Sequence, residues 1–520
     1  MKKLSLDLSL KIYVLFYIVL MLTYVSTWGF APGGGEWPSY SFPVASILYE
    51  FDFAVSSNTL EYFKKLFPEY VRFFQDENLN KALLHFSGYK TIDGTKTLVW
   101  YFPIYAILAL PFILFLKLIN LPTSLGFTYL NVASIAILLL LIIKYIKIPS
   151  FEKIFLVILI SCNPILFYVK HINGEPLIYS LIGISIVFWL SKKYYRSAFS
   201  ISLAGAMNPI VMVIGFGIIF SFFYELLKSN DFKIVNSIKT NIISILILGL
   251  CFIVSILPMF YNYYHTGHIN LSAGMLESFG ASLPYDQSNA IFARFIAYFT
   301  DLNFGFFAYY NLFLVFAFIM FVLSIFKKHS EYLKLSAIFL VIVFLYSLVI
   351  HINCGMSGIA RYNAWSAVII IFAVLIYLQD FFRDKALKIV KGILIFFMLL
   401  NFYIVAEYIK SPTMYVYFTK IAYQVLKYAP SLYNPLPSTF NSRVNHIDGG
   451  YFYETPIAFI DRQGYVRKIL ASKKDIEALN ASYIALDEKS KEKWQKEIDT
   501  LTEKESYLNF RKNYKIIENK

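Results

Sequence analysis

Long apolar segments are the feature that most constrains what this chain can fold into. Of its 520 residues, 58% are hydrophobic and 15% are charged, and the apolar residues are concentrated in separate runs. A run of roughly 20 apolar residues, wound as a helix that rises about 1.5 Å per residue, crosses a hydrocarbon core of about 30 Å. Because backbone polar groups find no water there, each run has to pair them internally. The chain is therefore predicted to be an all-α polytopic membrane bundle.

We expect about eleven transmembrane helices, because that many runs reach the required length. The predicted spans cover 9–30, 98–118, 124–145, 153–169, 175–191, 198–226, 237–260, 305–326, 333–352, 362–381 and 386–408. Basic pairs such as Lys192-Lys193 and Lys327-Lys328 mark cytoplasmic span ends. By this rule the two long polar loops, 31–97 and 262–304, lie on the external side.

Simple alternation of eleven spans would place Lys192-Lys193 on the external side, against that rule. The Asn208-Pro209 pair offers one repair, since a proline inside a helix removes a backbone donor and clashes with the preceding turn. The span 198–226 would then be two short helices, and another segment would have to be re-entrant. A helix broken at membrane depth lines a cavity or is buried in protein, which makes this stretch a pointer to a site.

The chain changes character after the last predicted span. Residues 1–410 are the predicted transmembrane domain, 411–450 a predicted interfacial connector rich in aromatic residues and proline, and 451–520 a predicted small soluble α/β domain on the external side. The strands of that domain are expected near 456–460, 483–486 and 514–518, with a helix over 489–505. The net charge of +14 comes mostly from span ends and this tail, so it indicates membrane anchoring and no nucleic-acid partner.

The first external loop carries the carboxylates best suited to chemistry, which are Glu36, Glu50 and Asp52. A carboxylate at a membrane surface can act as general base on a hydroxyl or bind a divalent cation that bridges a phosphate. Solvated loop acids are the alternative reading. Three glycines before Glu36 and Pro38 after it shape the backbone, and Tyr40 suits the membrane interface. Glu36 is therefore the first candidate and Asp52 the second.

Three further groups of residues lie at the ends of predicted spans. Tyr101, in an aromatic stretch, would roof a cavity or belong to an aromatic belt. Glu175 follows the polar stretch 170–174, where a carboxylate stabilises a helix N-terminus or marks a site. Arg361, followed by Tyr362, has the planar fork that binds phosphate oxygens, and snorkelling to lipid headgroups is its alternative. The cysteines and histidines show no metal-ligand spacing, so no metal site is predicted.

The stretches 36–40 (Glu-Trp-Pro-Ser-Tyr) and 45–53 resemble the first external loop of the GT-C superfamily of membrane glycosyltransferases, which includes protein mannosyltransferases and aminoarabinose transferases. Further similarities follow in the family's order at 100–112, 174–177, 304–309 and 358–362. Members often carry an acid before the glutamate, where this chain has Gly35. Either Glu36 acts alone, Asp52 substitutes for that acid, or catalysis has been lost.

The resemblance implies an enzyme of the inner (cytoplasmic) membrane that transfers a sugar from a polyprenyl-phosphate carrier to a glycan, lipid or protein acceptor at the external face, among membrane lipid. It implies catalytic roles for Glu36 and Asp52, and substrate binding by Arg361, Glu175, Tyr40, Tyr101 and Tyr362. The cofactor is left open, with a divalent cation as one option. The alternative function is a non-enzymatic lipid or polysaccharide translocator, or a catalytically inactive glycosyltransferase-like scaffold.

Overall fold

The computed structural model describes residues 5–27, 37–73, 88–99, 103–232, 234–269, 287–348, 358–410, 416–447, 454–484, 492, 495–496, 498–502 and 505–516. The chain divides into two compact units. Unit 1 comprises Met1–Tyr285, Leu312–Tyr346 and Ala364–Ala406, and unit 2 comprises Asp286–Asn311, Ser347–Asn363 and Glu407–Lys520.

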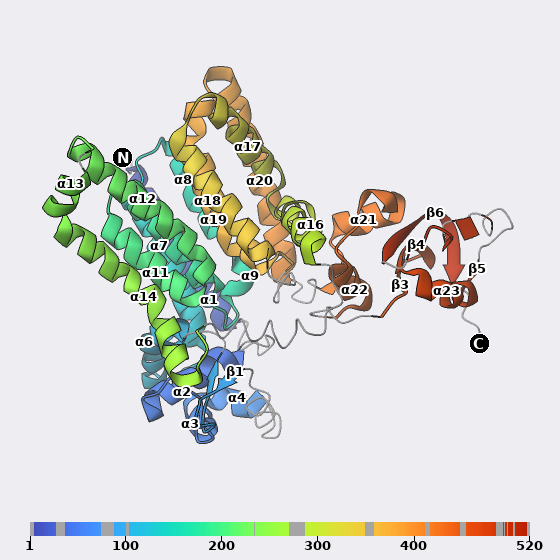
Figure 1. Ribbon diagram of the computed structural model, residues 1–520, viewed down its shortest axis with the longest axis horizontal. Helices are drawn as coiled ribbons and strands as arrows, with labels where there is room; N and C mark the ends of the chain where they lie inside the picture. The colour runs from blue at the N-terminus through green and yellow to red at the C-terminus, as the bar shows by residue number, and fades with distance from the viewer. Residues whose placement is uncertain are drawn as a thin grey trace. The chain divides into compact units, whose positions relative to one another are not determined.

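Eight of the described helices are long and apolar enough to cross a membrane (Figure 1). They are α1 (Leu6–Thr27), α7 (Leu125–Tyr145), α12 (Met212–Ser229) with the turn η1 (Pro209–Val211) before it, α14 (Ile242–Thr266), α17 (Phe306–Phe326), α18 (Ser330–Ser347), α19 (Arg361–Phe381) and α20 (Asp384–Lys410). The three other predicted spans fall on shorter helices, namely α6 (Ile104–Leu118), α8 (Ser150–Ser161) with α9 (Leu166–Val169), and α10 (Glu175–Leu190). The structure thus confirms a polytopic α-helical bundle, with eight full-length candidate spans among the described residues instead of about eleven.

The predicted break at Asn208-Pro209 is present. Helix α11 (Tyr194–Met207) ends there, and the side-chain oxygen of Asn208 accepts a hydrogen bond from the N–H of Ile210 at 3.2 Å. That bond caps the short turn before α12, as an asparagine does at a helix start. Helices α12 and α14 are then connected by α13 (Ile234–Thr240), and all three are green in Figure 1.

Most of the described part of the first loop forms helices and strands. Its helices are α2 (Trp37–Glu50), α3 (Thr59–Leu66) and α4 (Pro68–Phe73), and a hairpin follows, formed by β1 (Gly88–Lys90) and β2 (Thr97–Val99). Val55 extends the hairpin through two backbone hydrogen bonds with Thr97, at 2.8 and 2.9 Å. The buried rings of Phe42, Phe63 and Tyr70 pack against one another beneath it. This small aromatic core gives the loop a fixed shape.

The C-terminal part of unit 2 contains a four-stranded antiparallel sheet in the order β3-β4-β6-β5. In chain order the elements are α16 (Gln287–Thr300), α21 (Lys420–Tyr428), η3 (Pro430–Leu432), α22 (Pro437–Asn445), β3 (Ile457–Ile460), β4 (Tyr465–Ala471), η4 (Lys473–Asp475), α23 (Ile476–Ser482), β5 (Tyr483–Ile484) and β6 (Ser506–Ile516). Three of these strands lie at or next to the predicted positions, whereas β4 was not predicted. The described residues of the tail thus contain a small sheet with short helices.

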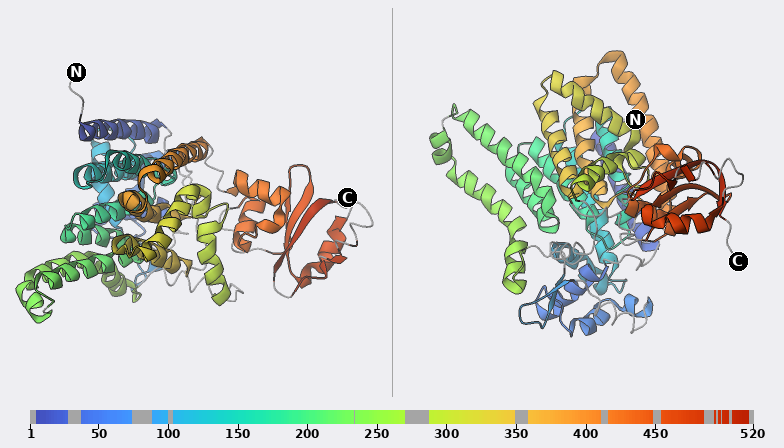
Figure 2. Two further views of the ribbon diagram at one scale, coloured as in Figure 1. Left: turned by 90° about the horizontal axis from the view of Figure 1, so that it is seen from above. Right: turned by 45° about the vertical axis from the view of Figure 1, so that its right-hand side comes forward.

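Both faces of this sheet are covered, because side chains alternate across each strand. Ile469 of β4 faces Leu479 of α23, whereas Leu470 faces Leu426 of α21 and Phe440 of α22. Figure 2 shows this order of layers, with the orange helices on one side of the red sheet. Residues 416–447, predicted as a connector, are thus part of the core of the domain.

A buried lysine of the sheet forms hydrogen bonds with the segment between α21 and α22. The ammonium of Lys468 on β4 donates to the carbonyl oxygen of Pro430 at 2.7 Å, to the side-chain oxygen of Asn434 at 2.6 Å and to that of Asn509. Burial lowers the pKa of this lysine to about 7. Three oxygen acceptors offset the cost of removing the amine from water.

Gly305, between α16 and α17, lies where the backbone of unit 2 is tightly packed. A Cβ atom there would lie 2.6 Å from the carbonyl oxygen of Asp301 and 2.7 Å from its nitrogen. Because backbone atoms cannot move aside cheaply, we expect Gly305→Ala to lower stability by about 1–3 kcal/mol. The measurement is the thermal unfolding temperature of the purified full-length protein. Gly249→Ala is the matched control, because a Cβ meets nothing within 4 Å there; equal unfolding temperatures for the two variants would contradict the prediction.

Candidate functional site

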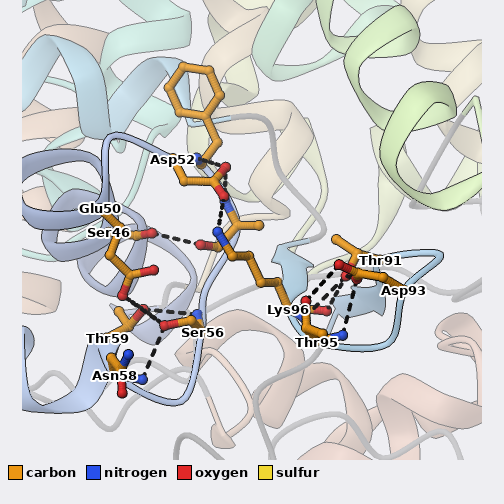
Figure 3. Close-up of polar contacts among 12 residues, drawn as sticks. Ser46, Glu50, Asp52, Ser56, Asn58, Thr59, Thr91, Asp93, Thr95 and Lys96 are labelled. Atoms are coloured by element: carbon orange, nitrogen blue, oxygen red, sulfur yellow. Dashed lines mark hydrogen bonds and ion pairs between the residues drawn. The ribbon is translucent and has the colours of Figure 1, made fainter.

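The Asp52 carboxylate is the centre of the polar contacts in the first loop. One oxygen accepts hydrogen bonds from the backbone N–H of Phe53 at 2.7 Å and of Ala54 at 3.2 Å, which turns the chain sharply after α2. The same oxygen accepts the hydroxyl of Tyr261 at 3.1 Å. The other oxygen pairs with the ammonium of Lys96 at 2.5 Å. Figure 3 shows Lys96 directed at Asp52 from the hairpin.

These contacts keep Asp52 ionised. Partial burial opposes ionisation, but the hydrogen bonds from Lys96 and from the backbone of Ala54 outweigh it, and the pKa of Asp52 lies below its usual range. The same hydrogen bond raises the pKa of Lys96. Because its two oxygens already have four donors, this carboxylate is suited to holding the first loop in position.

Glu50, on the other side of the turn, accepts hydrogen bonds from the hydroxyls of Ser56 at 2.7 Å and Thr59 at 3.1 Å (Figure 3).

The same contacts attach the first loop to the end of a membrane helix. Tyr261 lies in the last turns of α14, and its ring meets that of Phe53 edge-on at 5.3 Å. One turn further on, the carbonyl oxygen of His265 accepts the N–H of Ile92 in the hairpin at 2.8 Å. The loop predicted at 31–97 and the start of the loop predicted at 262–304 therefore meet on the same side of unit 1.

A second polar cluster forms around residues 170–175, which we call the knot. Its backbone is held by Asn131 of α7, whose amide donates to the carbonyl oxygens of Val169, His171 and Asn173 at 3.3 to 3.4 Å. The hydroxyl of Tyr105 in turn donates to the side-chain oxygen of Asn131 at 3.1 Å. One buried amide thus satisfies three carbonyl groups that have no helical partner.

Three predicted features converge at the knot. The Tyr40 ring on α2 contacts the Tyr105 ring edge-on at 4.9 Å. A Cβ atom at Gly174 would lie 2.5 Å from the side chain of Met207, where α11 ends, and 3.5 Å from the Tyr40 hydroxyl. The structure therefore brings together Tyr40, the start of α10 at Glu175 and the helix break.

The titratable side chains of the knot are mostly withdrawn from water. Glu175 is 3% exposed at the N-terminus of α10, and its backbone N–H donates to Asn173 at 2.9 Å. His171 is 8% exposed, and burial, with a contribution from the charge of Lys170, lowers its pKa to about 4. Burial also lowers the pKa of Lys170. At neutral pH the knot therefore contains a neutral imidazole beside a lysine that is only partly solvated.

Arg361 and Tyr362 belong to unit 2, where they begin α19. The Arg361 side chain is 4% exposed, so it does not extend into the surroundings as a snorkelling residue would. The adjacent backbone is fixed, because the N–H of Ala360 donates to the carbonyl oxygen of Phe304 at 3.0 Å, and Asn363 donates to Tyr298 at 2.9 Å. Two stretches of the resemblance, 304–309 and 358–362, are therefore neighbours in the fold.

Glu36 and Tyr101 lie outside the described residues, so their predicted roles stay predictions. Sequence reasoning missed Lys96, Tyr261 and Asn131. The Asp93-Gly94 pair, a hairpin signal, could have placed Lys96 near the start of a strand. Nothing in the sequence around Tyr261 or Asn131 singles them out, because each finds its partner far along the chain.

The described residues do not form a metal site. No three His, Cys, Asp or Glu side chains among them gather closely enough to hold an ion. A cation at Asp52 would also have to displace the Lys96 ammonium and the Tyr261 hydroxyl.

Repeated long apolar helices define the chain as a multi-pass membrane protein. No protein-family model, no curated protein and no solved structure matches it.

We expect Lys96→Met to loosen the hairpin by removing its ion pair. At pH 7 the protection factors of hairpin amides against hydrogen exchange should fall roughly five-fold, the equivalent of about 1 kcal/mol for a partly exposed pair. Because the folded-state pKa of Asp52 is lowered, this stabilisation is present above about pH 4 and is lost as the pH falls through the lowered pKa. Wild-type protection should therefore approach that of the variant in acid.

Lys90→Met is the control, since Lys90 is an exposed lysine at the end of β1. Protection that stays unchanged in Lys96→Met at pH 7 would show that the ion pair does not hold the hairpin.

Proposed function

We propose that the chain is an integral membrane glycosyltransferase that moves a sugar from a polyprenyl-phosphate carrier to an acceptor hydroxyl at the membrane surface beside the first loop. The observation that carries this proposal is the convergence at the knot. Tyr40 of the first loop, the start of α10 and the broken end of α11 meet there, and each was singled out from the sequence. The motif order resembling GT-C enzymes supports the same function.

In this proposal Glu36 is the base that takes the proton from the acceptor hydroxyl. It lies one residue before α2, the helix that carries Tyr40 to the knot. A carboxylate within hydrogen-bonding reach of a hydroxyl can remove its proton as the hydroxyl oxygen bonds to C1 of the sugar. The bond from C1 to the phosphate oxygen breaks in the same transfer, and polyprenyl phosphate is the leaving group. Asp52, at the other end of α2, positions the loop through Lys96 and Tyr261.

One cation of unit 1 is assigned to the phosphate of the carrier. Lys170 belongs to the knot and is half-buried, and a desolvated ammonium interacts more strongly with an anion than a hydrated one does. Phosphate binding by the planar fork of Arg361 in unit 2, which the resemblance implies, stays a prediction. Tyr40 and Glu175 are proposed to contact the sugar and the acceptor, and the substrate-binding roles of Tyr101 and Tyr362 stay predictions.

Glu36→Gln tests the proposal, because it keeps the size of the side chain and removes the base. Membranes containing the wild-type chain should transfer sugar from a panel of polyprenyl-phosphate sugars and not from nucleotide sugars. The variant should lose at least about a hundred-fold in rate, the typical contribution of a general base.

Asp93→Asn is the matched control, since Asp93 is an exposed acid of the same loop that bonds only to Thr91 and Thr95 among the described residues. Full activity of Glu36→Gln at normal abundance would refute the role of Glu36. The wild-type chain could instead transfer no sugar from any carrier and move the carrier lipid across vesicle membranes. That result would refute the glycosyltransferase and support the translocator function.

A further inference from the structure

Helix α21 in unit 2 has one face on which large apolar side chains, with Gln424 between them, are not covered by the described residues of the domain. Ile421 and Tyr428, seven residues apart and so on one face of the helix, are 53% and 70% exposed. Tyr417 before the helix and Leu432 after it are 47% and 78% exposed. We call these four residues the α21 stripe. The opposite face, with Ala422 and Leu426, is buried against the sheet.

The N-terminus of α21 is fixed at the ends of two membrane helices. Its capping residue Thr419 donates its hydroxyl to the carbonyl oxygen of Leu302 at 2.6 Å and its N–H to Asn303 at 3.1 Å, just before α17 begins. The next residue, Lys420, pairs at 3.0 Å with Glu407, where the apolar span of α20 ends. These contacts place the start of α21 beside the first residues of α17 and the last residues of the apolar stretch of α20, two of the candidate spans.

Basic and aromatic groups border the α21 stripe in the manner of a membrane-surface helix. The Lys427 ammonium lies 5.0 Å from the centre of the Tyr428 ring, and Lys420 directly precedes Ile421 at the start of the helix. Tyrosine, lysine and arginine extend their polar ends to lipid headgroups while their apolar parts stay in the interface.

We propose that the α21 stripe lies in the headgroup region of the bilayer, and that its partner is an anionic lipid surface. An amphipathic helix with basic residues beside its apolar face binds such a surface through buried apolar area and charge attraction. Membrane contact there would hold the C-terminal sheet against the bilayer. This contact is independent of any sugar transfer by the knot.

The experiment uses nitroxide labels on the full-length chain in vesicles of phosphatidylcholine with phosphatidylglycerol. Single labels are attached at Ile421→Cys, at Tyr428→Cys and, as the control, at Ala478→Cys on the exposed side of α23. Cys162, Cys251 and Cys354 are replaced by alanine. Labels at 421 and 428 should be relaxed by oxygen dissolved in lipid and shielded from a water-soluble nickel complex, whereas the label at 478 should show the reverse.

Nickel access at 421 and 428 equal to that at 478 would overturn the proposal. Dipolar broadening at 421 or 428 that disappears on dilution with unlabelled protein would also overturn it, because a second copy would then cover the stripe. If the cysteine-free background does not fold, Ile421→Trp in the otherwise native chain reads the same contact. Brominated lipid should quench the added fluorescence of Ile421→Trp and not that of Ala478→Trp; equal quenching would count against the membrane.

Discussion

The absence of water inside the bilayer is the constraint on which the rest of this structure depends. Every backbone N–H and C=O group at that depth needs a partner from the chain itself. Regular helices supply those partners within each span. Where the helices stop, single side chains supply partners. Asn208 does so at the break after α11, and Asn131 does so for the carbonyl group that ends α9 and for two carbonyl groups of the knot. The irregular segment that carries the candidate site is therefore stabilised by an asparagine amide that donates to its carbonyl groups.

At the ends of the spans, polar side chains join segments that are far apart in the sequence. Asp52 connects the turn after α2 with the hairpin and with α14. In unit 2, Tyr433 donates its hydroxyl to the buried Asp301 at 2.8 Å and accepts a hydrogen bond from Asn303 at 2.6 Å. Burial raises the pKa of Asp301, so its donors stabilise a carboxylate that would otherwise be costly to ionise. Each unit thus has its own set of polar side-chain contacts that joins distant segments.

Features set by local chemistry were predictable from the sequence. Apolar run length predicted the spans, and Pro209 predicted the break, because a proline interrupts a helix whatever surrounds it. The strand β4 was missed because it reads Tyr-Val-Arg-Lys-Ile-Leu-Ala, with two charged residues at its centre. Those charges are tolerated because Lys468 meets three oxygens and Arg467 pairs with Asp461 at 2.8 Å. Of the candidate site, Tyr40 and Glu175 could be named from local signals. Lys96 and Asn131 could not, because their partners are brought to them only by the tertiary fold.

The short helices around the knot have a consequence for the lipid. Helices α6, α10 and α11 contain 15, 16 and 14 residues. At about 1.5 Å per residue they are roughly 21–24 Å long, whereas the hydrocarbon core is about 30 Å thick. Such a mismatch is relieved by thinning of the bilayer beside the short helices. Beside α6, whose Leu114, Phe115 and Leu118 are exposed, such thinning would bring lipid headgroups closer to the membrane midplane than beside α14, which has 25 residues.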